Sequence, residues 1–119
     1  RTCYNGLMKV LHDPIKKENL ATSEVVFDEA MVKGVVDVER GLLAIDADLH
    51  ADLERMLLED GSRQDDVWGI NLWFEDDGED FVEFDSMINV RPRQGNRSRS
   101  VEDPALCQQI TEIVQKWIQ

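Results

Sequence analysis

The sequence has few cysteines and prolines, no long apolar run and little positive charge. Its two cysteines, Cys3 and Cys107, lie near opposite ends of the chain, which argues against a disulfide framework and against a cysteine zinc site. No apolar run approaches the roughly 20 residues of a membrane span, and no signal-peptide pattern opens the sequence. We therefore predict a cytoplasmic protein in a reducing compartment, without a membrane partner.

Acidic side chains outnumber basic ones by 25 to 13, so the net charge is −12. Binding to nucleic acid depends on neutralising phosphates, and anionic membranes attract basic segments. The charge therefore predicts that neither nucleic acid nor a membrane surface is a partner. The chain of 119 residues has the size of one domain, which we assign to residues 1–119.

The first third of the sequence has weak periodicity. Residues 6–11 could form a short strand, and Asp13 followed by Pro14 is typical of a helix start. The segment that follows, to about Ala30, predicts an irregular helix or a helix followed by a loop. In the C-terminal part of the sequence, Cys107 lies within a helical apolar pattern, and we expect it to pack as a small apolar residue.

Two pairs of β-rich segments follow. Residues 31–38 and 42–45 predict a hairpin, because β-branched residues alternate in the first segment and a turn around Gly41 separates the two. Residues 67–74 and 81–90 predict a second antiparallel pair around Gly78, whose freedom at positive φ suits a turn.

Two segments have the spacing of amphipathic helices. The first runs from Asp48 to Asp60, with Asp46 or Asp48 as its cap and Gly61 as its stop; the second runs from Asp103 to Ile118. Their apolar stripes are Leu49, Leu53, Met56 and Leu57, and Leu106, Ile110, Ile113, Val114 and Trp117. We predict an α+β fold, with a mainly antiparallel sheet of four or five strands and two or three helices packed on one face.

A cationic segment interrupts this acidic chain. Residues 90–100 hold four arginines and no carboxylate. Fixed positive charge on a connector often binds an anion, and functional residues concentrate on loops held by rigid elements.

A polar row lies next to this segment. If the second pair of strands is centred on Gly78, Asn71 falls near Asp85 and Trp73 near Glu83. The row could be a binding patch, in which carboxylates hold a cation or a sugar hydroxyl and arginines bind a phosphate. It could also be an ordinary solvated face with the arginines paired to the protein's own acids, or half of an oligomer interface.

Catalytic and cofactor motifs are weak. Gly95 stands alone, so neither phosphate-binding glycine pattern is present. His50 and Glu54 are one helical turn apart, which could suit a metal or an acid–base pair, although a lone helix histidine is more often a surface or capping group. Ser62 and Ser86 have no evident base. We predict no metal and no cofactor.

Several longer motifs resemble an uncharacterised prokaryotic family of short proteins, a domain of unknown function. They are LHAD at residues 49–52, LLEDGS at 57–62 with Gln64, WGIN at 68–71, EFDSMIN at 83–89, RP at 91–92, GNRSR at 95–99 and EDP at 102–104. The resemblance runs from about Met31 to the C-terminus, whereas residues 19–30 depart from the regular helix it implies. Similar small proteins occur on integron gene cassettes, so such an origin is an expectation here.

The resemblance supplies no activity, but its motifs fall on polar residues and imply a shared polar site at one end of the sheet. The candidate site residues are His50, Asp60, Ser62, Gln64, Asn71, Glu83, Asp85, Asn89, Arg91, Asn96, Arg97 and Arg99.

Two functions fit these features. The first is a non-catalytic binding or interaction module that forms a homo-oligomer, most readily a dimer. The alternative is a small enzyme or sensor that acts on a phosphorylated or carboxylated metabolite. In that case Arg91, Arg97 and Arg99 would bind the anion, and the acid–base or metal groups would be Glu83, Asp85 or His50. The sequence leaves open whether the protein is an enzyme.

Overall fold

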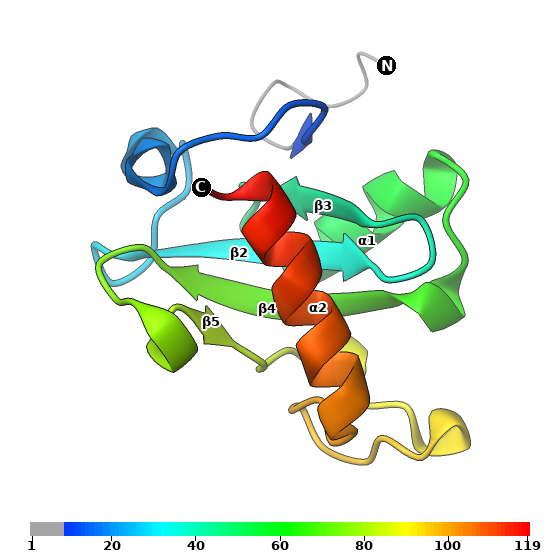
Figure 1. Cartoon of the computed structure of the whole chain (residues 1–119). Helices are drawn as coiled ribbons and strands as arrows, with labels where there is room; N and C mark the ends of the chain where they lie inside the picture. Colours follow the sequence, from blue (N-terminus) through cyan, green and yellow to red (C-terminus); the bar gives the residue numbers. More distant parts are fainter. Residues whose placement is uncertain (1–8) are drawn as a thin grey trace.

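The computed structural model describes residues 9–119 and contains a five-stranded antiparallel sheet in the order β1-β3-β2-β4-β5 (Figure 1). The strands are β1 Lys9–Val10, β2 Met31–Asp37, β3 Leu42–Ile45, β4 Val67–Trp73 and β5 Val82–Glu83. The α-helices are α1 His50–Glu59 and α2 Pro104–Trp117. The predicted α+β fold with an antiparallel sheet is confirmed.

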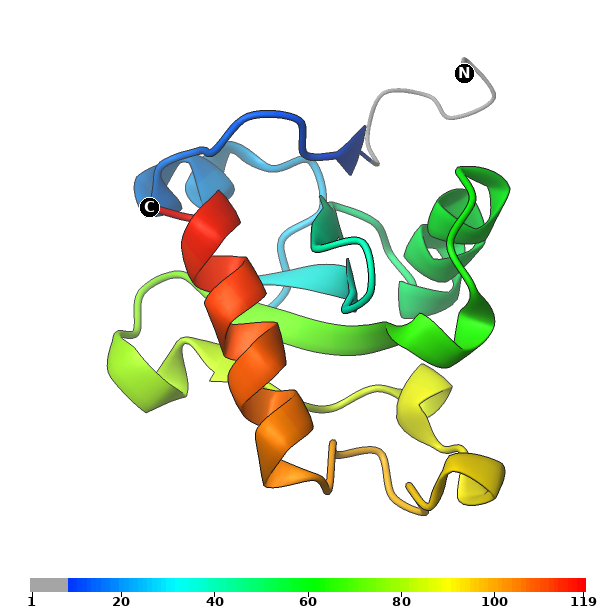
Figure 2. The ribbon, with the colours of Figure 1, turned by 45° about the vertical axis from the view of Figure 1, so that its right-hand side comes forward.

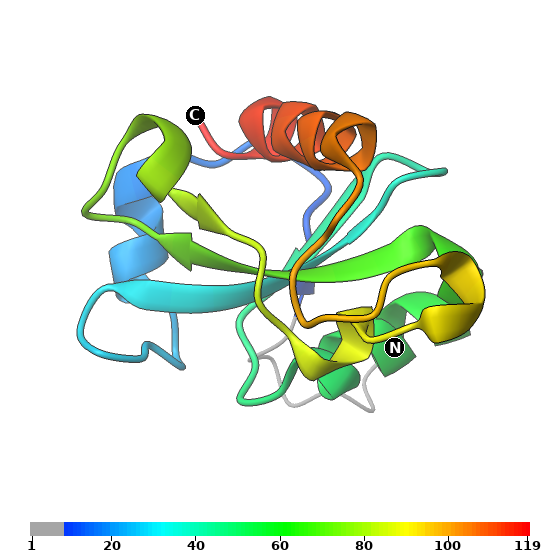
Figure 3. The ribbon, with the colours of Figure 1, turned by 90° about the horizontal axis from the view of Figure 1, so that it is seen from below.

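The two α-helices cover opposite faces of the sheet (Figure 3). Val36 of β2 belongs to the core under α2, whereas the neighbouring Val35 packs with Leu53 and Leu57 of α1. The prediction that the helices share one face is therefore wrong for α1. The physical reason is that β2 carries valines on both faces, and a strand that is apolar on both faces must be covered twice.

The hairpin of β2 and β3 is confirmed, with Val35 opposite Ala44. The buried Asp37 carboxylate ends β2 and accepts hydrogen bonds from the backbone N–H groups of Glu39 and Arg40 at 2.8 and 2.9 Å. This carboxylate therefore fixes the turn to β3.

The segment around Ile15 lies beside the C-terminal end of α2 (Figure 2). The helix start predicted at Asp13 and Pro14 is wrong, because the chain bends at Asp13 and Ile15 then bridges Ile118. A 3₁₀ helix follows at Lys17–Thr22. Of the predicted first strand, Lys9–Val10 is confirmed, while residues 6–8 and Cys3 lie outside the described residues.

Helix α1 begins two residues later than predicted, with Leu49 at the N-cap and no side-chain cap. The predicted caps are wrong: Asp46 instead accepts hydrogen bonds from the backbone N–H groups of Glu24 and Val25. Leu49 is 55% exposed, and His50 takes its place on the buried face. The predicted stop is confirmed, because Gly61 has a φ of +111° just after the helix.

The predicted strand at residues 81–90 is largely wrong, because only Val82–Glu83 pairs with β4. Ser86 ends the extended segment, since its Oγ accepts a hydrogen bond from the N–H of Ile88 and starts a 3₁₀ turn at Met87–Asn89. The register also differs by two residues from the predicted one, with Asn71 opposite Glu83 rather than Asp85.

The prediction for α2 is confirmed. Its N-cap is Asp103, whose side chain accepts a hydrogen bond from the N–H of Ala105, and Pro104 occupies the first turn. Cys107 is half-buried against the core and donates a hydrogen bond to the Val101 carbonyl, and burial raises the pKa of its thiol. Within residues 9–119, neither helix has the length and apolar character to cross a membrane.

Candidate functional site

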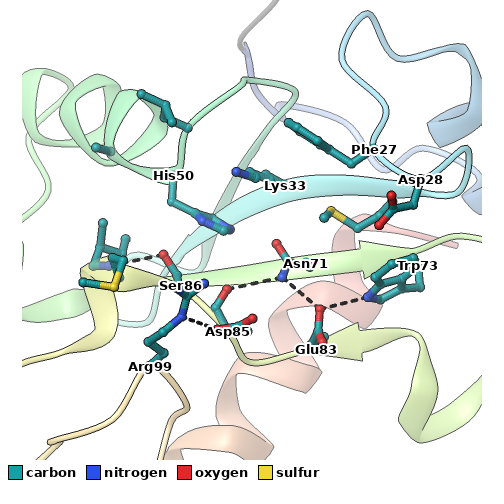
Figure 4. A pocket seen from close by; sticks show the side chains of 15 residues that line it. Phe27, Asp28, Lys33, His50, Asn71, Trp73, Glu83, Asp85, Ser86 and Arg99 are labelled. Carbon is teal, nitrogen blue, oxygen red and sulfur yellow. Dashed lines mark hydrogen bonds and ion pairs between the residues drawn. The ribbon is translucent and has the colours of Figure 1, made fainter.

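A cavity of about 530 Å³ lies between the N-terminal end of α1, the polar rows of β2 and β4, and the chain that follows β5 (Figure 4). We call it the His50 pocket. It is lined by Phe27, Asp28, Met31, Lys33, Leu49, His50, Ala51, Asn71, Trp73, Glu83, Asp85, Ser86, Met87, Ile88 and Arg99.

Asn71 of β4 lines the pocket. Its Nδ2 donates to Glu83 Oε1 at 2.9 Å and to the Asp85 carbonyl at 3.2 Å. Because both partners are acceptors, the amide orientation is fixed, and Oδ1 points away from them toward the side where His50 and Lys33 lie (Figure 4). Oδ1 is buried without a hydrogen-bond partner in the described residues, and Asn71 as a whole is only 5% exposed.

His50 stands beside this amide. Its Nε2 lies 2.8 Å from the Ile70 carbonyl, which can only accept, so Nε2 carries the proton. Burial is the main cause that lowers the His50 pKa, and Lys33 lowers it further. The Ile70 carbonyl, Asn71 and Asp85 act in the opposite direction. The Asn71 side chain therefore favours the protonated form of the His50 ring, although Asn71 Oδ1 accepts no hydrogen bond from His50 in this structure. The lowered pKa favours the neutral imidazole.

Gly69 explains how His50 and Ser86 approach β4 so closely. A Cβ atom at Gly69 would lie 2.6 Å from the Ser86 Cβ and 3.2 Å from the His50 Cδ2. The Ser86 side chain is buried, and its Oγ caps the turn that follows by accepting from the N–H of Ile88. Ser86 therefore has a positioning role and is not placed as a nucleophile.

Both cations of the pocket contact acceptors of the protein itself. Arg99 Nε donates to Asp85 Oδ1 at 2.6 Å. Lys33 Nζ donates to the Asp48 carbonyl at 2.9 Å and lies 4.6 Å from the centre of the Phe27 ring. The pocket thus contains internal ion pairing and one cation–π contact.

The rim next to Phe27 is a strained turn. Asp28 and Glu29 have φ values of +50° and +66°, in the left-handed region that non-glycine residues seldom occupy. The turn is closed by reciprocal backbone hydrogen bonds between Phe27 and Met31. Such strain persists where surrounding contacts hold it and is frequent at ligand sites.

Arg91 of the cationic segment is an anchor rather than part of the pocket. Its guanidinium donates to the backbone carbonyls of Ile88, Gln64 and Val67 and lies 4.4 Å from the Trp68 ring centre. Its charged partner is Glu54, at 3.7 Å.

Glu54 and Arg91 line a second cavity, of about 670 Å³, together with Gln64. Burial raises the pKa of Glu54, while Arg91 acts to lower it. The predicted pairing of His50 with Glu54 is wrong, because the two side chains line different cavities. Among residues 9–119 no group of three or more histidine, cysteine or acidic side chains could hold a metal ion.

Two asparagines, which we call the asparagine latch, close the outer edge of β4. Asn89 binds both backbone groups of Gly69, donating to its carbonyl at 2.9 Å and accepting from its N–H at 2.8 Å, and also donates to the Arg99 carbonyl. Asn96 in turn donates to the carbonyls of Asn89 and Ser100. Both latch residues are buried.

The other predicted site residues lie elsewhere. Arg40 donates to Asp60 Oδ2 and to Ser62 Oγ at 2.9 Å each, while Ser62 donates to the Asp37 carboxylate at 2.5 Å. This cluster joins the β2–β3 turn to the end of α1. Arg97 is exposed and contributes its backbone N–H to Glu102.

The structure thus brings five of the predicted residues into the His50 pocket: His50, Asn71, Glu83, Asp85 and Arg99. Sequence reasoning missed Lys33, Phe27 and Asp28. Lys33 lies directly opposite Asn71 in the pairing of β2 with β4, so predicting that pairing would have found it. No sequence signal marks the irregular segment that supplies Phe27 and Asp28.

The buried imidazole leads to a prediction about pH. The folded-state pKa of His50 is lowered, so the unfolded chain binds the proton more readily. Stability that is fully present above about pH 6.5 should therefore be lost as the pH falls below that value. Urea unfolding between about pH 7.5 and 5.5 should show this slope in the natural protein and a flatter one in His50→Gln. Equal slopes would contradict the assignment.

Comparison with known proteins supports the sequence resemblance. No curated protein and no solved structure shows significant similarity to the chain. Residues 9–117 match the family described as Protein of unknown function (DUF5674). The match extends N-terminal to Met31, where the resemblance was expected to begin, and includes the irregular segment. Because it spans most of the chain, the protein belongs to this family of unknown function.

Proposed function

We propose that the protein is a non-catalytic binding module whose ligand occupies the His50 pocket. The observation that carries this proposal is the buried Asn71 Oδ1, an acceptor without a partner in the described residues. Leaving such a group unpaired costs about 1–3 kcal/mol. A ligand that donates a hydrogen bond to Oδ1 would recover part of this free energy on binding.

The size and lining of the pocket support the same reading. A volume of about 530 Å³ is in the range of small-molecule sites. Polar groups of Asn71, Glu83 and Lys33 meet there with the apolar side chains of Leu49 and Met87. Apolar walls with a few converging polar groups are typical of sites that bind and orient a small molecule.

The hydrogen bonds of the pocket favour binding over catalysis. His50 Nε2 donates to a backbone carbonyl and Ser86 Oγ caps a turn, so these two groups do not form a nucleophile and base pair. Glu83 Oε1 accepts from both Asn71 and Trp73. These groups shape the site, and their contacts do not assign them a proton-transfer role.

A thermal-shift panel tests the proposal. The panel should contain nucleotides, sugar phosphates, dicarboxylates, amines and divalent metals. We expect at least one organic class to raise the Tm, because a ligand that binds only the folded state stabilises it by mass action. Asn71→Ala should abolish that gain, whereas Asn19→Ala, at an exposed asparagine outside the pocket, should retain it. A gain that persists in Asn71→Ala would refute the assigned site.

Assembly of two copies is a second candidate role. The specific observation is a group of exposed large apolar side chains: Leu49 at 55%, Met87 at 65% and Val90 at 37% exposure. Met87 lines both cavities, and methionine is enriched at protein interfaces. Two copies that meet at Met87 would cover these side chains.

Sedimentation velocity tests this second role. We expect a dimer for the natural chain and a monomer for Met87→Glu. Gln108→Glu is the matched control, since it adds the same charge on exposed α2 residue 108 and should leave the dimer intact. A monomeric natural chain at high concentration would contradict self-association.

The alternative prediction, an enzyme or sensor for an anionic metabolite, has less support. Arg91 contacts backbone carbonyls and Glu54, and Arg99 is paired with Asp85. A bound anion would have to compete with these internal acceptors. Arg97, which is exposed, is the remaining arginine of that prediction.

A further inference from the structure

We propose that the His50 pocket recognises an alkylammonium group, either of a free amine or of a lysine side chain. This inference rests on the proposed binding function and specifies its ligand. It also reverses the sign of charge that the cationic segment suggested. The juxtaposition that supports it is a buried, unpartnered amide oxygen beside carboxylates and an aromatic ring.

The buried amide oxygen of Asn71 requires a hydrogen-bond donor. Asn71 Oδ1 accepts no hydrogen bond in the described residues, and its orientation is fixed by the two acceptors that hold Nδ2. A ligand that meets it must carry N–H or O–H groups. An ammonium group carries three N–H donors and can satisfy Oδ1 together with further acceptors nearby.

Two of the nearby acceptors are carboxylates without an ion-pair partner in the described residues. Glu83 and Asp28 line the pocket, and neither forms an ion pair within residues 9–119. Asp85 is already neutralised by Arg99 at 2.6 Å. The protein as a whole carries a charge of −12, which raises the local concentration of cations. Because Glu83 and Asp28 have no ion-pair partner in the described residues, the pocket favours binding of a cation over binding of a neutral donor.

The pocket also has an aromatic lining. Trp73 lines the pocket and donates to Glu83 at 3.0 Å, which holds its indole beside the carboxylate. Aromatic faces attract ammonium groups. The pocket already contains one such contact, since the Lys33 ammonium lies 4.6 Å from the Phe27 ring centre. Met87 at the rim can cover the methylene chain that an alkylammonium group carries.

Lys33 makes the proposal sharply testable, because it is a like charge for an ammonium ligand and an opposite charge for an anion. Lys33→Met should strengthen amine binding by roughly fivefold, since an exposed charge contact is worth about 1 kcal/mol. Glu83→Gln should weaken it by about as much while keeping an acceptor for Asn71 and Trp73. Gln108→Glu is the control and should change neither.

The experiment is an NMR titration that follows the Gly69 backbone amide and the Asn71 side-chain amide. The probes are n-butylamine, 1,4-diaminobutane, a capped lysine peptide, tetramethylammonium and butanoate, all at equal ionic strength. We expect saturable shifts with the first three probes. Tetramethylammonium lacks N–H donors and should bind more weakly, and butanoate should not bind.

The two sources of the ammonium group are distinguished by affinity. Tighter binding of 1,4-diaminobutane indicates a free amine, and tighter binding of the lysine peptide indicates a lysine of a partner protein. Equal binding of tetramethylammonium and n-butylamine, or weaker amine binding in Lys33→Met, would overturn the proposal. If butanoate or phosphate shifts the same resonances and amines do not, the ammonium inference fails and the binding module survives. If no compound in this set or in the thermal-shift panel binds, both fail.

Discussion

Replacing Asn89 by alanine is expected to lower the free energy of unfolding by about 3 kcal/mol, because it leaves several buried backbone groups without partners. The Asn89 side chain binds the N–H and the carbonyl of Gly69 and the carbonyl of Arg99. The side chain is fully buried, so water does not replace these bonds without entering the core. The loss should be measured by urea unfolding at pH 7.

Two further variants separate the lost bonds from a general effect of the substitution. Asn89→Asp keeps an acceptor for the N–H of Gly69 but cannot donate when ionised, so it should destabilise the fold as much as alanine does. Asn19→Ala, at an exposed asparagine, should change the free energy of unfolding by less than about 0.5 kcal/mol. If Asn89→Ala matched Asn19→Ala, the asparagine latch would have no role in stability.

Arg91→Met is expected to cost about 3–5 kcal/mol, because it breaks a buried ion pair by removing one partner. Arg91 and Glu54 have side chains that are only 10% and 14% exposed. The change also removes the donors to the carbonyls of Gln64, Val67 and Ile88. A methionine side chain fills a volume similar to that of arginine, so the loss of stability measures mainly the lost charge and hydrogen bonds of Arg91.

The pH dependence of this variant identifies the cause. Without Arg91 the pKa of Glu54 should rise further, because burial already raises it and the opposing cation is gone. The folded state then holds a proton that the unfolded chain releases above about pH 4.5, so the destabilisation should grow as the pH rises above that value.

Adding Glu54→Gln to Arg91→Met should remove this pH dependence and restore part of the stability, since no buried charge is then unpaired. Arg93→Met is the control on the same turn, at an exposed arginine, and should be nearly neutral. Arg91→Lys should remain destabilised, because an ammonium group cannot reach three carbonyls in fork geometry. Full stability in Arg91→Lys would contradict the anchor role.

The parts of the fold that follow a regular period could be predicted from the sequence. The alternation in β2 and the cap and proline that start α2 specify those elements locally. The helical spacing gave a wrong prediction at the start of α1. It placed the apolar Leu49 on the buried face, whereas the structure buries His50 there and leaves Leu49 exposed. A neutral imidazole that pairs with a carbonyl can be buried, and hydrophobicity alone does not show that pairing.

The candidate site could be predicted only in part, because polar residues at a turn look alike whether they bind a ligand or the backbone. Asn89 and Asn96 were predicted as binding residues, and the structure uses them to satisfy backbone groups. Asn71 and Glu83 were also predicted, and they do lie in a pocket. What distinguishes Asn71 from Asn89 and Asn96 is that its amide oxygen has no partner in the described residues, which depends on tertiary contacts.

The short β5 strand has a consequence for the behaviour of the protein in crowded solution. β2 pairs with β4 along its whole length, but β5 pairs with β4 only at Asn71 and Leu72. Residues 67–70 of β4 therefore have no strand on the side away from β2. An open strand edge of this composition is a template on which other chains add and aggregate. Asn89 occupies both backbone groups of Gly69, and Arg91 occupies the carbonyl of Val67. These two side chains therefore also protect the protein from polymerising edge to edge, independently of any ligand.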